Sequence, residues 1–138
     1  MKAKVKQIVG AYNALGEAKT STLESSDVLS IIKARRAMRS IVEDYEAFVK
    51  DATEKLKPAD FDALVEIERK GDKATNDEKA YHNENVTKYH KAIVDAINEE
   101  FSKEMELELP KLSDEAQAKL LKENSWSVAR LDDLSIFV

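Results

Sequence analysis

The chain has 138 residues, a net charge of −5 at neutral pH and no cysteine. Without cysteine there is no disulfide framework, no thiol nucleophile and no thiolate zinc site. The acidic balance argues against a general nucleic-acid binder, because neutralised phosphates supply most of that affinity. Charged residues make up 36% and apolar residues 43% of the chain, which is typical of a helical protein, and we expect a single domain over residues 1–138.

The N-terminal segment predicts a short helix over about residues 3–18, with its apolar residues on one stripe. Lysines at positions 2, 4 and 6 form a small basic arm that could contact an acidic surface. Residues 20–24 are short, polar and tolerant of extended backbone, so they read as a loop or a short strand.

The dominant feature is a long helix predicted over about residues 27–57. Its apolar and small residues repeat in steps of three and four, which is the spacing of a heptad seam, and Pro58 ends the helix. A rod of this length needs a second helix to cover the seam. The seam consists of Ile31, Ala34, Met38, Ile41, Tyr45, Phe48, Ala52 and Leu56.

The middle of the chain supplies a candidate for that second helix. A short helix is expected over about 60–70, stopped by Gly71, and Thr75 with Glu78 has the form of a capping box. The helix that follows, about 77–103, carries its own apolar stripe. We therefore predict that 27–57 and 77–103 pack as a long antiparallel hairpin.

The spacing of apolar residues changes from helical to alternating in the C-terminal part of the chain. Residues 105–109 alternate between apolar and acidic, which predicts a half-buried strand, and 20–24 is the best internal mate for it. Short helices follow, the first capped by Ser113. The predicted fold is thus mainly α, with at most a two-stranded β element made by 20–24 and 105–109.

Two groups of residues are candidates for partner contacts. Trp126 lies in a polar turn, where it either fills a small core or anchors a partner. The apolar tail Ile136, Phe137 and Val138 is expected to dock on its own core or on a neighbour.

The only dense basic cluster contains Arg35 and Arg36, between Lys33 and Arg39. It forms either an internal ion-pair network, with Arg39 facing Glu43, or a contact for an anionic partner.

The sequence contains few candidates for a catalytic or metal-binding site. Glu78, His82 and His90 could share a helix face for a metal, but a usable site needs more ligands and better spacing, so surface histidines are the favoured reading. The sequence contains no phosphate loop, nucleophile elbow or dinucleotide fingerprint. We expect no catalytic residue, no metal, no cofactor and no small-molecule substrate.

The layout resembles small helical proteins of unknown function that are encoded among the structural genes of tailed phages and prophages. The residues behind this resemblance are Tyr12-Asn13-Ala14-Leu15, then Ile31, Arg36 and Tyr45, the strand 106–109, and Leu131, Leu134, Ile136 and Phe137. The extra helix around Phe61 departs from that layout. The resemblance implies a role in virion assembly and no catalytic residue.

Three functional hypotheses follow. The first is a non-enzymatic interaction or structural protein, which self-associates or binds another protein, with phage or prophage assembly as its setting. The second is a small regulatory adaptor or antitoxin-like protein that uses the basic arm or the arginine cluster. The third is a helical metal-binding enzyme. No apolar run approaches the roughly 18 residues of a membrane span, so we expect a cytoplasmic location, or a virion-associated one if a phage encodes the protein.

Overall fold

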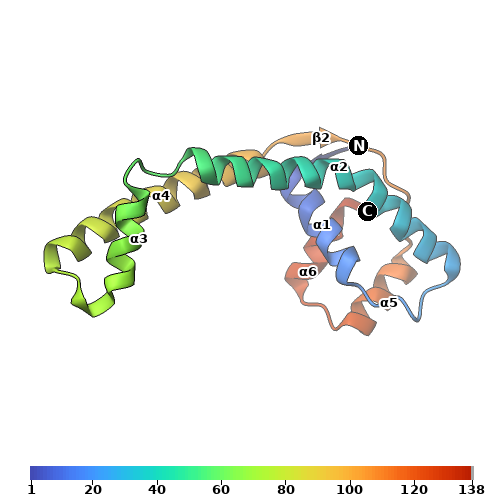
Figure 1. Ribbon diagram of the computed structural model, residues 1–138. Coiled ribbons are helices and arrows are strands. Elements are labelled where there is room, and N and C mark those ends of the chain that lie inside the picture. Colours follow the sequence, from blue (N-terminus) through green and yellow to red (C-terminus); the bar gives the residue numbers. More distant parts are fainter. Residues whose placement is uncertain (138) are drawn as a thin grey trace. The chain divides into compact units, whose positions relative to one another are not determined.

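The computed structural model describes residues 1–137 and has the expected mainly α architecture (Figure 1). Val138, one of the candidate contact residues, lies outside the described residues. The elements are β1 (Lys2–Lys4), α1 (Val5–Glu17), α2 (Ser25–Lys55), α3 (Phe61–Lys70), η1 (Gly71–Lys73), α4 (Asn76–Phe101), β2 (Glu104–Glu106), α5 (Asp114–Asn124), α6 (Val128–Asp133) and η2 (Ser135–Phe137).

The chain divides into two compact units. Unit 1 consists of residues 1–46 and 101–138, and unit 2 is the intervening segment 47–100. The first part of α2 therefore belongs to unit 1 and its last residues, from Ala47 on, belong to unit 2. Whether the two units fold as the single domain expected from the sequence stays a prediction.

The predicted pairing of α2 with α4 is consistent with two contacts, one in each unit. In unit 1, the rings of Tyr45 and Phe101 stack with centroids 4.8 Å apart. In unit 2, the Tyr89 hydroxyl donates a hydrogen bond of 2.8 Å to the Thr53 carbonyl. Later residues of α2 meet earlier residues of α4, which is the antiparallel sense of a helical hairpin.

The two-stranded sheet exists, but the predicted first strand is wrong. β2 pairs antiparallel with β1, with Lys2 opposite Glu106 and Lys4 opposite Glu104. Opposite charges facing across a strand pair favour this register, so the basic N-terminal arm already lies beside an acidic strand of its own chain. Residues 20–24 form a turn instead, with the Leu23 amide bonded to the Thr20 carbonyl.

The hydrophobic core belongs to unit 1. One face of α1 supplies buried residues, including Ile8 and Ala11, and the first half of α2 supplies Ile31 and Met38. Leu120 of α5 is also fully buried there. The first half of the predicted α2 seam is thus a true core stripe, covered by short helices of the same unit.

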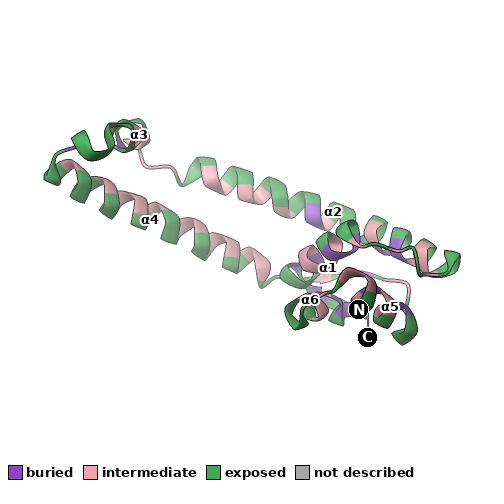
Figure 2. Ribbon diagram, turned by 90° about the horizontal axis from the view of Figure 1, so that it is seen from below, coloured by how far each residue is buried: buried purple, intermediate pink, exposed green. Residues whose placement is uncertain are grey.

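Unit 2 is different, because very little of it is buried. Among residues 47–100, all of which the structure describes, only Leu64 and Ala74 are buried. Figure 2 shows α4 in the colours of exposed and intermediate residues alone. The apolar side chains of this unit are half-buried at best, so its helices have a partly covered seam and no closed core.

Local signals explain where α3 ends and where α4 begins. Gly71 follows α3 with φ +55° and ψ −125°, a backbone conformation that suits glycine alone. The predicted capping box is confirmed: the Glu78 amide donates to Thr75 Oγ1 at 3.1 Å, and the Thr75 amide donates to Glu78 Oε1 at 3.0 Å.

Candidate interaction surfaces

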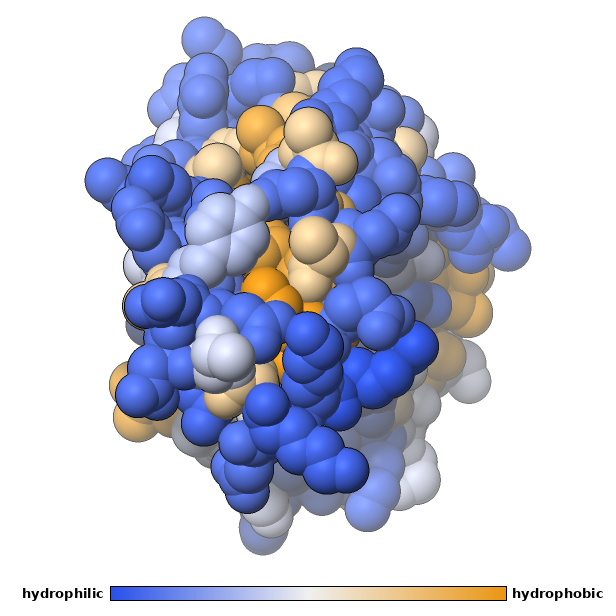
Figure 3. All heavy atoms as spheres, turned by 60° about the vertical axis from the view of Figure 1, so that its left-hand side comes forward, coloured by the Kyte–Doolittle hydropathy of each residue, from blue (hydrophilic) through white to orange (hydrophobic). Residues whose placement is uncertain are grey.

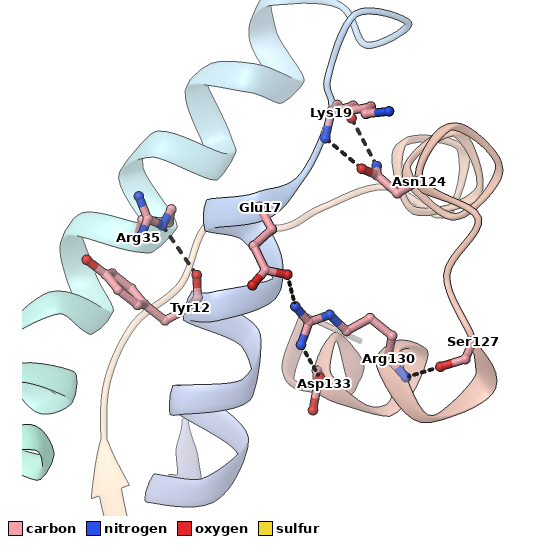
Figure 4. A network of polar contacts seen from close by, with 8 residues as sticks. All are labelled: Tyr12, Glu17, Lys19, Arg35, Asn124, Ser127, Arg130 and Asp133. Atoms are coloured by element: carbon pink, nitrogen blue, oxygen red, sulfur yellow. Dashed lines mark hydrogen bonds and ion pairs between the residues drawn. The ribbon is translucent and has the colours of Figure 1, made fainter.

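Arg35, one of the predicted contact residues, is used inside unit 1. Its guanidinium carbon lies 4.1 Å from the centroid of the Tyr12 ring, and its Nε donates a hydrogen bond of 3.4 Å to the Tyr12 carbonyl (Figure 4). A Cβ at Gly16 would lie only 2.8 Å from this guanidinium. Arg35 therefore joins α2 to α1 by a cation–π contact and a hydrogen bond, which leaves little of it for a partner.

A second polar contact joins α1 to α6. Arg130 bridges Glu17 of α1 and, at 3.5 Å, Asp133 of its own helix, and Ser127 caps α6 by accepting a hydrogen bond from the Arg130 amide (Figure 4). The two helices approach closely, because a Cβ added at Gly10 would lie 2.5 Å from Asp133 Oδ1. These polar groups fix the short helices around the core.

The loop after α1 is held by the C-terminal end of α5. Glu123 accepts hydrogen bonds from the amide and hydroxyl groups of both Ser21 and Thr22. The Ser21 hydroxyl, followed by the groups of Thr22, holds the pKa of the Glu123 carboxyl below its usual value. Asn124 and Lys19 exchange two further hydrogen bonds, of 2.7 and 3.1 Å (Figure 4). The bonds to Glu123 occupy the Ser21 and Thr22 amides, which a strand over 20–24 would have needed.

Arg36, by contrast, is exposed on the outer face of α2. The predicted ion-pair network of the cluster is wrong: in the described part of the chain, no ion pair involves Lys33, Arg36 or Arg39. Leu29 and Ile32 lie on the same face, with 48% and 41% of their surface exposed. We call Leu29, Ile32, Lys33 and Arg36 the α2 patch, an apolar pair beside unpaired basic side chains.

The apolar tail docks on its own chain. Ile136 and Phe137 are buried in the core of unit 1, so these two predicted contact residues already have partners. They also line one wall of an open cavity of about 620 Å³, together with Leu109, Pro110 and Asp27. Trp126 packs partly against the same core and stays partly exposed, which fits the filling of a small core.

Unit 2 offers a second surface on α4, which shares His90, Val94 and Ile97 with the apolar stripe that the sequence suggests for this helix. Along α4, uncharged residues recur in steps of four and three, and most of them are exposed; Val94 has 53% of its surface exposed. Figure 3 shows that apolar atoms reach the surface between hydrophilic ones on this face of the molecule. We call the following residues the α4 stripe: Asn76, Ala80, Asn83, Thr87, His90, Val94 and Ile97.

The residues proposed for a metal have other neighbours. Glu78 forms an ion pair of 2.7 Å with Lys70 and completes the capping box, and the hydrogen bond from Lys70 lowers the pKa of this carboxyl. His82 Nδ1 lies 3.3 Å from the Asn83 side-chain oxygen. Among residues 1–137, no three acidic or histidine side chains are placed to hold a metal ion.

Comparisons with known proteins give no relative. No protein-family model, curated protein sequence or solved structure matches this chain. Within residues 1–137, none of the helices combines the length and apolar character needed to cross a membrane. The function must therefore be argued from the surfaces themselves.

Proposed function

We propose that this chain is a non-enzymatic interaction protein, in which unit 1 contains the hydrophobic core and the exposed helix faces of unit 2 bind a protein partner. The observation that carries the proposal is the burial of unit 2: α4 extends over residues 76–101 without one buried residue. Helices in water are stabilised mainly by packing of an apolar face. A helix that its own chain covers so poorly gains the most stability when a partner packs against it.

The exposed side chains of unit 2 support the same proposal. Tyr81, Val94 and Leu56 are all among the large apolar residues with more than a third of their surface exposed. Of these, Val94 belongs to the α4 stripe, which charged residues flank, an arrangement typical of protein interaction sites.

The proposal is tested with a photo-crosslinking amino acid placed at Val94, in cells that produce the protein. We expect crosslinks to one defined protein, either a second copy or a different chain, and far fewer from the same probe at Asp95, the next residue along α4. Equal, diffuse labelling from both positions would overturn the proposal.

The setting we propose is the assembly of a phage or prophage particle, which rests on the resemblance in layout. Genes for capsid and tail proteins beside this gene would support that setting. A neighbouring small toxin gene would favour the second candidate instead.

The second candidate is a regulatory adaptor or antitoxin-like protein, and the α2 patch is the observation that favours it. Leu29 and Ile32 provide apolar contact area, while Lys33 and Arg36 have no ion-pair partner in the described chain. Such a surface suits an acidic amphipathic helix of a partner. Charge reversal by Arg36→Glu would weaken binding to the product of the adjacent toxin gene, and unchanged binding would remove this candidate.

A further inference from the structure

We infer that the partner of the α4 stripe is a second copy of this chain, whose α4 packs antiparallel to the first. This inference rests on the proposed function and names the partner. It starts from the composition of the stripe, which contains no charged residue although 36% of the chain is charged. The members of the stripe other than Ile97 are exposed, and Ile97 is half-buried.

The spacing of the stripe is that of a helix–helix interface. Its steps are 4, 3, 4, 3, 4 and 3, which is the heptad pattern that keeps one seam facing a partner helix. The stripe lies on a different side of α4 from Tyr89, whose hydroxyl bonds to α2. Tyr89 thus faces its own chain, and the exposed members of the stripe, from Asn76 to Val94, are open to another helix. Beyond Ile97 the stripe side ends at Phe101, whose ring stacks on Tyr45 of α2.

The sequence of the stripe is complementary to itself when it is reversed. A two-fold dimer requires that residue i of one copy meet residue j of the other, and that j meet i. In an antiparallel pair with Thr87 opposite His90, Asn83 falls opposite Val94, and Ala80 falls opposite Ile97. The bulky residues Val94 and Ile97 then face smaller ones, so side chains can interdigitate. Thr87 and His90 can share a hydrogen bond.

Charges beside the stripe select this register. Glu84, which also forms an ion pair of 3.2 Å with Lys88 of its own helix, and Lys91 are exposed; they directly follow Asn83 and His90 and so flank the same edge of the stripe. In an antiparallel helix pair, residues on one edge meet residues on the same edge of the other copy. The register above places Glu84 opposite Lys91 of the other copy, twice by symmetry. Sliding the second copy by one heptad would bring the two Glu84 carboxylates together instead.

The interface is polar for a heptad seam, because asparagine, threonine and histidine occupy four of its positions. Polar residues at such positions specify register and lower stability. We therefore expect a weak, reversible dimer, whose population rises with protein concentration over the micromolar range.

The experiment is sedimentation velocity of the full chain over increasing concentration, with a charge swap across the interface. Glu84→Lys alone and Lys91→Glu alone each place like charges opposite each other and weaken dimerisation roughly tenfold. The double variant Glu84→Lys/Lys91→Glu restores the opposite-charge pairs and the wild-type dimer. Asp95→Lys, an exposed reversal away from the stripe, leaves dimerisation unchanged. Circular dichroism confirms that every variant keeps its helical content.

The outcomes separate this inference from the proposed function. A wild-type chain that stays monomeric at every concentration, or a double variant that dimerises no better than the single ones, overturns the second-copy assignment. If the Val94 probe then crosslinks a different protein, the interaction function stands with another partner. If the probe also labels nothing specific, both proposals fall.

Discussion

The Thr22 hydroxyl donates a hydrogen bond of 2.9 Å to Glu123 Oε2, and so ties the loop after α1 to the last turn of α5. Ser21 donates to the other carboxylate oxygen through its amide and hydroxyl. One carboxylate thus satisfies four donors of a segment that has no strand or helix of its own. The ionised carboxylate of Glu123, which only accepts hydrogen bonds, therefore holds this loop in place.

The first prediction concerns pH. Hydrogen bonds from Ser21 and then Thr22 lower the pKa of Glu123 from 4.5, so its stabilising contribution is present above the unfolded value and is lost as the pH falls through the lower folded value. The variant Glu123→Gln should therefore be less stable than wild type at neutral pH, with the difference shrinking below about pH 4.5. Urea unfolding followed by fluorescence of Trp126, the single tryptophan, measures this in unit 1.

Glu115→Gln is the matched control on the same helix, because Glu115 pairs with Lys119 at 3.4 Å and both lie on α5. We expect a smaller change at neutral pH, as for an exposed ion pair. A stability difference between wild type and Glu123→Gln that is the same at acidic and neutral pH would contradict the role given to the carboxylate.

The second prediction concerns the start of α4. Thr75→Ala removes the side-chain acceptor of the capping box and leaves the Glu78 amide without its partner. Loss of such a cap costs about 1 kcal/mol. We expect a lower midpoint for the helical signal in circular dichroism and little change in the Trp126 signal, because the cap lies in unit 2 and Trp126 in unit 1. A matching shift of both signals would show that the units unfold together.

Much of the fold could be read from local sequence signals. The heptad spacing, the stop at Pro58 and the capping box at Thr75 are local and strong, and they gave the long helices and their boundaries to within a few residues. The strand mate was wrong because pairing is a long-range property. Nothing between residues 20 and 24 shows that Glu123, a hundred residues later, binds that segment.

The candidate surfaces were predicted less well, because exposure depends on packing. Ile136 and Phe137 are buried in the core of unit 1, and the Arg35 guanidinium packs over the Tyr12 ring. The α4 stripe could have been found from the sequence as a heptad without charges. Its asparagine, threonine and histidine residues make it too polar to stand out as an apolar repeat.

The third prediction separates the two arginines. Arg35→Lys loses the planar group that stacks on Tyr12 and binds its carbonyl, so we expect a loss of about 1 kcal/mol in the free energy of unfolding. Arg36→Lys keeps the charge of an exposed side chain and should change stability by less than about 0.5 kcal/mol. Chemical denaturation of both variants provides the comparison. Equal effects would mean that the Tyr12 contact contributes nothing.

The fourth prediction tests the close approach of α1 and α6. Gly10→Ala improves helix propensity by up to about 1 kcal/mol, but its Cβ would lie 2.5 Å from Asp133 Oδ1 and 2.9 Å from Cγ. Asp133 must rotate away and give up its contact with Arg130 at 3.5 Å. We therefore expect Gly10→Ala to stabilise the protein by less than its helix propensity alone would give.

Asp133→Ala supplies the decisive second variant, because the Asp133 Cβ lies 3.5 Å from the new methyl position, an ordinary contact distance. In the wild-type background this change removes the Arg130 contact and should be neutral or slightly destabilising. In the Gly10→Ala background it removes the clash and should stabilise. Residues in contact commonly couple by about 0.5–3 kcal/mol, so a double-mutant cycle measures the effect. Additive changes would mean that α1 and α6 move apart without strain. Only a fixed distance between the two helices makes the stability effect of Asp133→Ala depend on whether residue 10 is Gly or Ala.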